Sequence, residues 1–382
     1  MNRKTYPILL AFLCMGFGDA VGPFVGLAKE QFQLTNFEAQ LITFMGFIMF
    51  GILSIPMSLY QDRKGKKNVL LLGLAIALIG LTIPLFGLSN YALFLLTILM
   101  LGAGAAILQV AGNPIMRDVS EPGKYSRNLS FGQFVKAIGS LSGSLIPFAA
   151  ASWFGASWKV LFPIYVAFLL LTLVVISLTK ISEEKEDHQT ANFTSSFSLL
   201  KNPFILFMVL GIFVYVGIEI CISSGVPILL NSQFGIRIET WGLLGNAFFF
   251  LAILTGRFLG SVVLNWIKPQ RFLQLTTLLS LLGILLIFFN IQAYTLVGIF
   301  ITGIGFANIF PLIFSITIDA MPERSNEISG LMVTAIAGGA FIPPLMGVMA
   351  DAFSVLVGFS VPLLGLLYLI LIAFTRMKKF NA

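Results

Sequence analysis

The sequence predicts an all-α membrane protein of twelve transmembrane helices, arranged as two six-helix pseudo-repeats. The first observation behind this prediction is composition, because 58% of the 382 residues are hydrophobic and only 10% are charged. A soluble domain has about 25% charged residues. The second is the length of the apolar runs, about 20 continuous residues each, which suits helices rather than the alternating strands of a membrane barrel. The third is an internal repeat, in which short segments recur at matching places in the two halves.

Twelve apolar segments account for most of the chain. The first segment carries Asp19 and Pro23 and lacks a small-residue cleavage site. We therefore expect it to be a membrane span rather than a cleaved signal peptide. The approximate bounds of the predicted spans are 6–28, 40–60, 69–88, 92–117, 129–151, 159–179, 203–230, 241–265, 272–290, 294–317, 328–350 and 355–375.

The distribution of basic residues predicts the orientation. An even number of spans places both termini on one side of the membrane, and 18 of the 23 Lys and Arg residues fall on that side. Only Lys29, Lys159 and Arg237 fall on the other side, and Lys136 and Arg257 lie within spans. The positive-inside rule therefore predicts that both termini are cytoplasmic.

The longest polar stretch divides the chain. It covers residues 180–202, reads KISEEKEDHQTANFTSSFSLLKN, and lies between spans six and seven. Its composition is typical of a solvated linker. We predict an N-terminal six-helix bundle at 1–180, a cytoplasmic linker loop at 181–202 and a C-terminal six-helix bundle at 203–382.

The two halves repeat each other. The segment GQFVKAI at 132–138 matches GLMVTAI at 330–336 with a constant offset of 198 residues. Span four carries VAGNP at 110–114, and span ten carries FANIFP at 306–311. Such pairs at corresponding spans are typical of transporters whose two halves move about a central site.

The sequence contains few residues of the kinds that enzymes and metal sites use. The chain has one histidine and two cysteines, and both cysteines lie inside apolar runs. We find no nucleophile–base set and no cluster of metal ligands, so we predict neither an enzyme nor a bound metal or cofactor. The net charge of +7 belongs to the loops and does not predict nucleic-acid binding.

A signature follows the second span. The loop reads Asp62-Arg63-Lys64-Gly65-Lys66-Lys67, which supplies an acid, a turn glycine and bases near helix ends. This loop, with the twelve spans, resembles the major facilitator superfamily, and the resemblance implies the major facilitator fold. Further segments resemble its fucose:proton symporter and glucose–galactose permease branch: FGDAVGP (17–23), QLTNFEAQLI (33–42), LQVAGNP (108–114), GRFLG (256–260), FANIFPLIFSIT (306–317) and SGLMVTAIAGGAFIPPLMG (329–347). They imply sugar transport and spread over nearly the whole chain.

Asp19 is the main candidate for proton coupling. It lies about 18 Å into span one, near the middle of the membrane. An intramembrane carboxylate suggests function, although it can also pin a helix break. The resemblance implies that Asp19 takes part in proton-coupled sugar binding. Gln109 stands where the fucose branch carries a glutamate, and we consider it either a sugar ligand or an interhelical hydrogen-bond group.

Gln133 and Lys136 lie one turn apart on span five, so they share a helix face. The branch carries neutral residues at both places, and Lys136 therefore introduces a cation. Three roles are open for Lys136. It can pair with Asp19 or Glu219, it can bind an anionic substrate, or its side chain can extend to the cytoplasm.

Several other polar residues lie in or beside the spans. Glu219 in span seven is a candidate ligand or second proton site, or else the buried partner of a base. Asn113 and Asn308 can bind hydroxyl groups or satisfy backbone near a proline. Arg257 is predicted to have a gating or packing role. Asp62, Arg63 and Gly65 of the signature loop are assigned the same kind of role.

Taken with the resemblance, these residues predict a secondary active transporter in a bacterial inner membrane. It would import a monosaccharide of the hexose or deoxyhexose type, with a co-transported proton, by alternating access. We predict that it acts as a monomer, with a sugar and the lipid bilayer as its partners. The alternatives are a carrier of an anionic sugar, such as a sugar acid or a sialic-acid-like compound, and a membrane sensor that does not transport.

Overall fold

The computed structural model describes residues 5–87, 90–119, 125–180, 197–264, 266–321 and 324–375. Almost all of these residues lie in helices. In chain order the helices are α1 Thr5–Asp19, α2 Val21–Phe32, α3 Asn36–Lys64, α4 Lys66–Thr82, η1 Ile83–Phe86, α5 Tyr91–Asp118, α6 Tyr125–Phe154, η2 Trp158–Val160, α7 Leu161–Leu178, η3 Leu199–Lys201, α9 Pro203–Phe234, η4 Ile238–Gly242, α10 Leu243–Val263, α11 Pro269–Phe288, α12 Gln292–Phe306, α13 Ile309–Ala320, α14 Ser325–Thr334, η6 Ala335–Ala337, α15 Gly338–Ala352, α16 Val355–Gly358 and α17 Ser360–Phe374.

The predicted spans are confirmed. Eleven helical segments of the described residues are long and apolar enough to cross a membrane. The pair α1 and α2, bent by 41° at its break, supplies the twelfth. The sequence placed every span correctly, although several helices extend a few residues beyond the predicted bounds.

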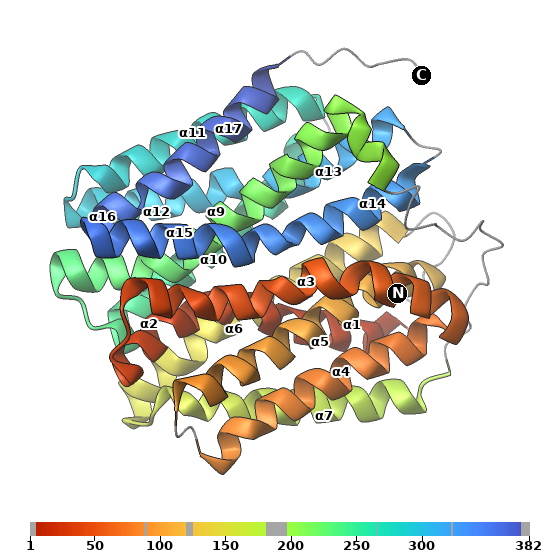
Figure 1. The fold of residues 1–382 in the computed structure, drawn as a ribbon, viewed down its shortest axis with the longest axis horizontal. Coiled ribbons are helices and arrows are strands. Elements are labelled where there is room, and N and C mark those ends of the chain that lie inside the picture. Colours follow the sequence, from red (N-terminus) through yellow and green to blue (C-terminus); the bar gives the residue numbers. More distant parts are fainter. Residues whose placement is uncertain are drawn as a thin grey trace.

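The helices lie roughly side by side and form two groups (Figure 1). Helices α1 to α7, in red to yellow-green, form the first half, and α9 to α17, in green to blue, form the second. The first and last described helices begin and end at the same end of the molecule, here named the N/C end. The opposite end, which carries the connection from α2 to α3, is named the far end.

Local sequence explains several helix ends. Thr35 accepts a hydrogen bond from the backbone of Glu38, and the Glu38 side chain accepts one from the backbone of Thr35. This capping box starts α3 at the far end. Gly65, with φ of 87°, makes the tight turn between α3 and α4 that the signature loop predicts.

In spans one and ten, a helix break lies four residues before a proline. Proline has no backbone N–H and clashes with the carbonyl four residues before it. Pro23 therefore disturbs the carbonyl of Asp19, where α1 ends, and Pro311 disturbs that of Ala307, where α12 gives way to α13. The break in span one places the Asp19 carboxylate at the join of two half-helices, near the N-terminus of α2.

Each half has its own apolar core, and the cores interlock. Phe47 and Phe50 of α3 pack with the core of the second half. Ile228 of α9, Ile238 of η4 and Leu243 of α10 pack with the core of the first half. Helix pairs α2–α9, α3–α15 and α6–α10 make the main contacts between halves. The exact bounds of the linker stay a prediction, since residues 181–196 lie outside the described part.

Candidate functional site

A close approach of α1 and α6 brings the first polar pair together. A Cβ at Gly16 would lie 2.1 Å from the carbonyl oxygen of Lys136, and one at Gly139 would lie 2.2 Å from that of Leu13. Only glycine permits this spacing. The Asp19 and Lys136 side chains can then meet across the helix pair.

Asp19 and Lys136 form a direct ion pair. The distance between Lys136 Nζ and Asp19 Oδ2 is 3.0 Å, with side-chain exposures of 13% for Lys136 and 30% for Asp19. Lys136 Nζ also donates to Gln109 Oε1 at 3.2 Å, and Ser140 Oγ donates to Asp19 Oδ2 at 3.2 Å. The predicted pairing of Lys136 with Asp19 is therefore present, and α1, α5 and α6 each contribute to this polar group.

The second half contributes a second polar group from α9 and α10. The Glu219 carboxylate interacts electrostatically with Arg257, and also with Asp19 and Lys136. The Tyr215 hydroxyl lies beside Glu219 and donates to the carbonyl of Phe306 at 3.0 Å. The predicted candidates Asp19, Lys136 and Glu219 thus lie within electrostatic range of one another, between the halves.

Charge in this centre is balanced. Lys136 has Asp19 as its direct ionic partner, and Arg257 interacts with Glu219 electrostatically. Burying two acids and two bases together costs far less than burying any of them alone. A base that is already matched by a carboxylate leaves little net positive charge to attract an anionic ligand.

The other amide candidates lie differently. Asn308 is buried at the break between α12 and α13, and its Nδ2 donates to the carbonyl of Gly256 at 2.7 Å. The Asn308 amide also fills the space beside Gly260 on α10. Gln133 lies half-buried on α6, one turn before Lys136. Asn113 lies in α5, but its side chain is outside the described part, so its role as a ligand stays a prediction.

The signature loop joins helices at the N/C end. Arg63 is exposed, and the side chain of Asp62 lies outside the described part. Lys67 Nζ donates to the carbonyls of Ser177 and Thr179, both at 2.9 Å. A cation at the C-terminal carbonyls of α7 is favourable and links α4 to α7.

A clasp at the far end joins the two halves. Asp351 of α15 accepts hydrogen bonds from the backbone N–H groups of Asn36 at 2.9 Å and Phe37 at 2.7 Å, and from Asn36 Nδ2 at 2.6 Å. A carboxylate from the second half therefore caps helix α3 of the first half. Lys29 Nζ donates to Asn36 Oδ1 beside this cap and interacts electrostatically with Asp351.

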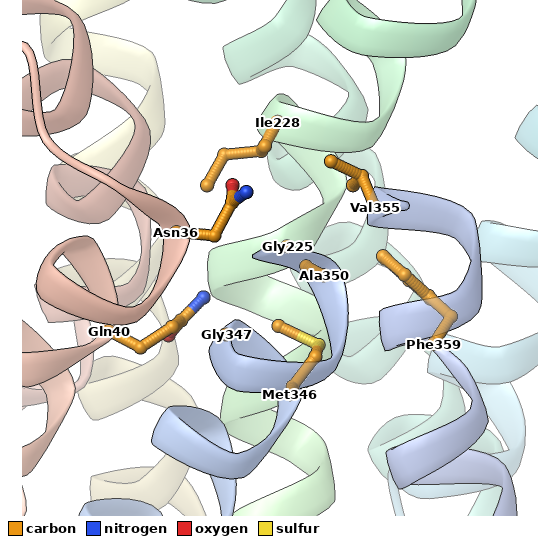
Figure 2. Close-up of a pocket in the computed structure, with 9 residues that line it drawn as sticks. All are labelled: Asn36, Gln40, Gly225, Ile228, Met346, Gly347, Ala350, Val355 and Phe359. Carbon is orange, nitrogen blue, oxygen red and sulfur yellow. The ribbon is translucent and has the colours of Figure 1, made fainter. Parts of the chain in front are cut away.

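Just inside the clasp, side chains fill the space between α3, α9 and α15 (Figure 2). Ser224 Oγ donates to Gln40 Oε1 at 3.0 Å, which links α9 to α3. Asn36 and Gln40 point toward a remaining cavity of about 10 Å³, which holds about one water molecule and no sugar. The far end is therefore closed between α3, α9 and α15.

Sequence reasoning missed several of these residues. Ser140 could have been found, because it lies four residues after Lys136 on the same face of α6. Tyr215 could have been found in the same way, because it lies four residues before Glu219 on the same face of α9. Gln40 and Ser224 carried no signal in the sequence, because a single polar residue in a span has many possible partners.

Within the described residues, no group of three or more His, Cys, Asp and Glu side chains could hold a metal ion.

Comparisons with known proteins identify the family. The sequence model described as Major Facilitator Superfamily matches residues 8–344. The chain belongs to this superfamily. A putative glucose/galactose transporter of Helicobacter pylori is 32% identical to this chain, covering 96% of it and 95% of the relative. The L-fucose-proton symporter of Escherichia coli is 25% identical, covering 92% of this chain and 89% of the relative.

A solved structure of the E. coli fucose:proton symporter shares the fold of this superfamily member. Its TM-score is 0.70 at 22% sequence identity, over 99% of this chain and 100% of that one. The family and the two relatives are transporters rather than enzymes. The predicted fold and family are thereby confirmed.

Proposed function

We propose that this protein imports a monosaccharide of the hexose or deoxyhexose type, together with a proton, by alternating access. Relatives named as glucose/galactose transporter and L-fucose-proton symporter over nearly the full chain support the class of substrate and the coupling ion. The observation that carries the proposal is the ion pair of Asp19 and Lys136 at the broken first span, with Gln109 bonded to the same ammonium.

In this proposal Asp19 is the proton carrier. Protonation of its carboxylate removes the charge that holds Lys136, and the ammonium then relies on Gln109 and on neighbouring polar groups. The polar groups around Asp19 can then rearrange around the hydroxyl groups of a sugar. Release of the proton restores the ion pair and favours the empty site. Gln109, Gln133, Asn113, Glu219 and Asn308 are the proposed candidates for sugar contacts.

The balanced charge of the centre supports a neutral sugar over an anionic one. Lys136 first suggested an anionic substrate, but its charge is met by Asp19. An incoming carboxylate would have to compete with Asp19 for the same ammonium. A neutral polyol needs only hydrogen-bond donors and acceptors, which Gln109 and the acids supply.

We further propose that the N/C end is cytoplasmic, as the basic residues predict, and that the protein works as a monomer in a bacterial inner membrane. With the far end clasped and the side chains of Asp19 and Lys136 reached by solvent, the described conformation then opens toward the cytoplasm.

Uptake into proteoliposomes tests the proposal. Radiolabelled D-glucose, D-galactose, L-fucose, an amino sugar and a sugar acid are each offered with and without an inward proton gradient. We expect a neutral sugar to accumulate only with the gradient. Accumulation of the sugar acid alone would favour the anionic alternative, binding without flux would indicate a sensor, and no sugar-dependent flux or binding would refute the proposal.

A further inference from the structure

Two buried polar side chains between the halves have no hydrogen-bond partner. Asn246 of α10 and Ser144 of α6 are both 0% exposed. Neither the amide nitrogen nor the amide oxygen of Asn246 is bonded, and the Ser144 hydroxyl is also without a partner. Buried polar groups are nearly always paired in proteins, because an unpaired group keeps its full cost of desolvation. These two residues, here named the seam pair, therefore need an explanation.

Ser144 lies on the face of α6 that meets the second half. Leu141, three residues earlier, packs against the core of the second half. Phe148, four residues later, contacts the ring of Trp241, with 6.3 Å between ring centroids. Residues 141, 144 and 148 form one stripe of a helix. Ser144 lies one turn after Ser140, whose hydroxyl donates a hydrogen bond to Asp19. It is about 12 Å beyond Lys136 along α6, toward the far end.

Asn246 lies on the face of α10 that carries Arg257. Asn246 and Arg257 are eleven residues apart, which corresponds to three helical turns plus about 20°. Their side chains therefore lie on the same face of α10, about 16 Å apart along its axis. Leu243, one turn before Asn246, packs with the core of the first half. This face of α10 is therefore turned toward the first half, with Arg257 at the central site and Asn246 nearer the far end.

The members of the seam pair lie at the same level. Helices α6 and α10 pack against each other and run in opposite directions. Ser144 lies four residues before Phe148 on α6, and Asn246 lies five residues after Trp241, which is in η4 directly before α10; Phe148 and Trp241 contact each other. Each is thus about one turn below an aromatic contact that covers this seam at the far end.

We propose that Asn246 and Ser144 bind hydroxyl groups of the transported sugar while the far end of the carrier is open. An amide offers donors and an acceptor, and a hydroxyl offers one donor and two acceptors, which suits neighbouring hydroxyl groups on a sugar ring. When the far end closes, α6 and α10 come together and the sugar has moved toward Asp19 and Lys136. The seam pair is then buried without partners, as in the described conformation. This inference rests on the proposed function.

Uptake kinetics with deoxy sugars test the inference. In proteoliposomes with the far end outward, the best-transported of D-glucose, D-galactose and L-fucose is compared with its monodeoxy analogues. For Asn246→Ala we expect the half-saturating sugar concentration to rise about 10-fold, and for Ser144→Ala about threefold. Asn246→Ala should also lose the wild-type preference for the parent sugar over one particular deoxy analogue, which a packing defect would not change.

Two further variants complete the test. Thr255→Val on α10 is the matched control, because its hydroxyl already donates to the Leu251 carbonyl and should leave the kinetics unchanged. Ser144→Cys should react with an impermeant maleimide from the far side, and the sugar should slow the reaction even if Asn246→Ala does not fold. If the variants discriminate deoxy sugars as the wild type does, or if the sugar gives no protection, the inference is wrong. If the wild type transports none of these sugars, the proposed function fails first.

Discussion

The two halves of the carrier hold their central charges in different ways. In the first half, Asp19 and Lys136 form a direct ion pair of 3.0 Å, and Asp19 lies at a helix break. In the second half, Glu219 lies in the unbroken helix α9, beside Tyr215, and interacts electrostatically with Arg257. Glu219 is two residues beyond the place that the 198-residue offset assigns to Asp19. Each half therefore holds one acid and one base, but the bases are not related by the repeat, because the position that matches Lys136 is Thr334.

The breaks also differ between the halves. Span one is broken at Asp19, whereas span seven continues through Glu219 as α9. Span four continues as α5, whereas the matching span ten is broken beside Asn308. The break in span one thus places an acid at the centre, and the break in span ten places an amide that is bonded to Gly256. We infer that the first half carries the moving proton and the second half supplies a more fixed partner surface.

The largest effect is expected when the ion pair of the first half loses one member. Lys136→Ala leaves the Asp19 carboxylate partly buried without its cation, which is strongly unfavourable. We expect proton-driven uptake in proteoliposomes to fall to background, while sugar counterflow without a gradient persists. In the double variant Asp19→Asn with Lys136→Gln, counterflow should persist and dependence on the proton gradient should disappear. Normal proton-driven uptake by Lys136→Ala would contradict the assigned coupling role.

A smaller effect is expected from the acid of the second half. Glu219→Gln removes the charge that interacts with Arg257, and we expect proton-driven uptake to fall roughly 10-fold, with the gradient still required. Tyr215→Phe, which removes only a hydroxyl, should cost about threefold. Initial uptake rates with and without a proton gradient separate the two variants. Loss of gradient dependence in Glu219→Gln would show that the proton site lies in the second half, which reverses the comparison.

The smallest effect is expected at the clasp between the halves. Asp351→Asn weakens the cap on α3, a change of about 1 kcal/mol, or roughly fivefold in the balance between closed and open far ends. Spin labels at the exposed far-end residues Phe154 and Phe353, changed to cysteine, report the opening as a longer distance in double electron–electron resonance.

Glu38→Gln is the matched control for this prediction. Glu38 caps the same end of α3 from within the first half, so its loss should leave the distance between halves unchanged. Equal distance distributions for Asp351→Asn and the wild type would show that the clasp does not hold the far end closed.

The sequence by itself determined the membrane class, the twelve spans and the family, because these depend on local hydrophobicity and on motifs. It also determined that Asp19 lies deep in span one, since depth follows from position in an apolar run. Pro23 and Pro311 each lie four residues after a break and weaken the backbone there, although Pro56, Pro147 and Pro227 lie inside helices that continue. Most polar residues of the site could therefore be predicted from the sequence. Ser140, Ser224 and Tyr215 were not predicted.

Only the tertiary structure decided which of these residues meet. The sequence left Lys136 with three roles, and the close approach of α1 and α6 at Gly16 and Gly139 gave it Asp19 as a partner. The clasp joins Asp351 to residues more than 300 positions earlier in the chain. The seam pair is defined by the absence of a bond, which becomes visible only once α6 and α10 are packed together. Pairing in a membrane bundle depends on how helices are rotated and how closely they approach, and neither follows from the pattern of one helix.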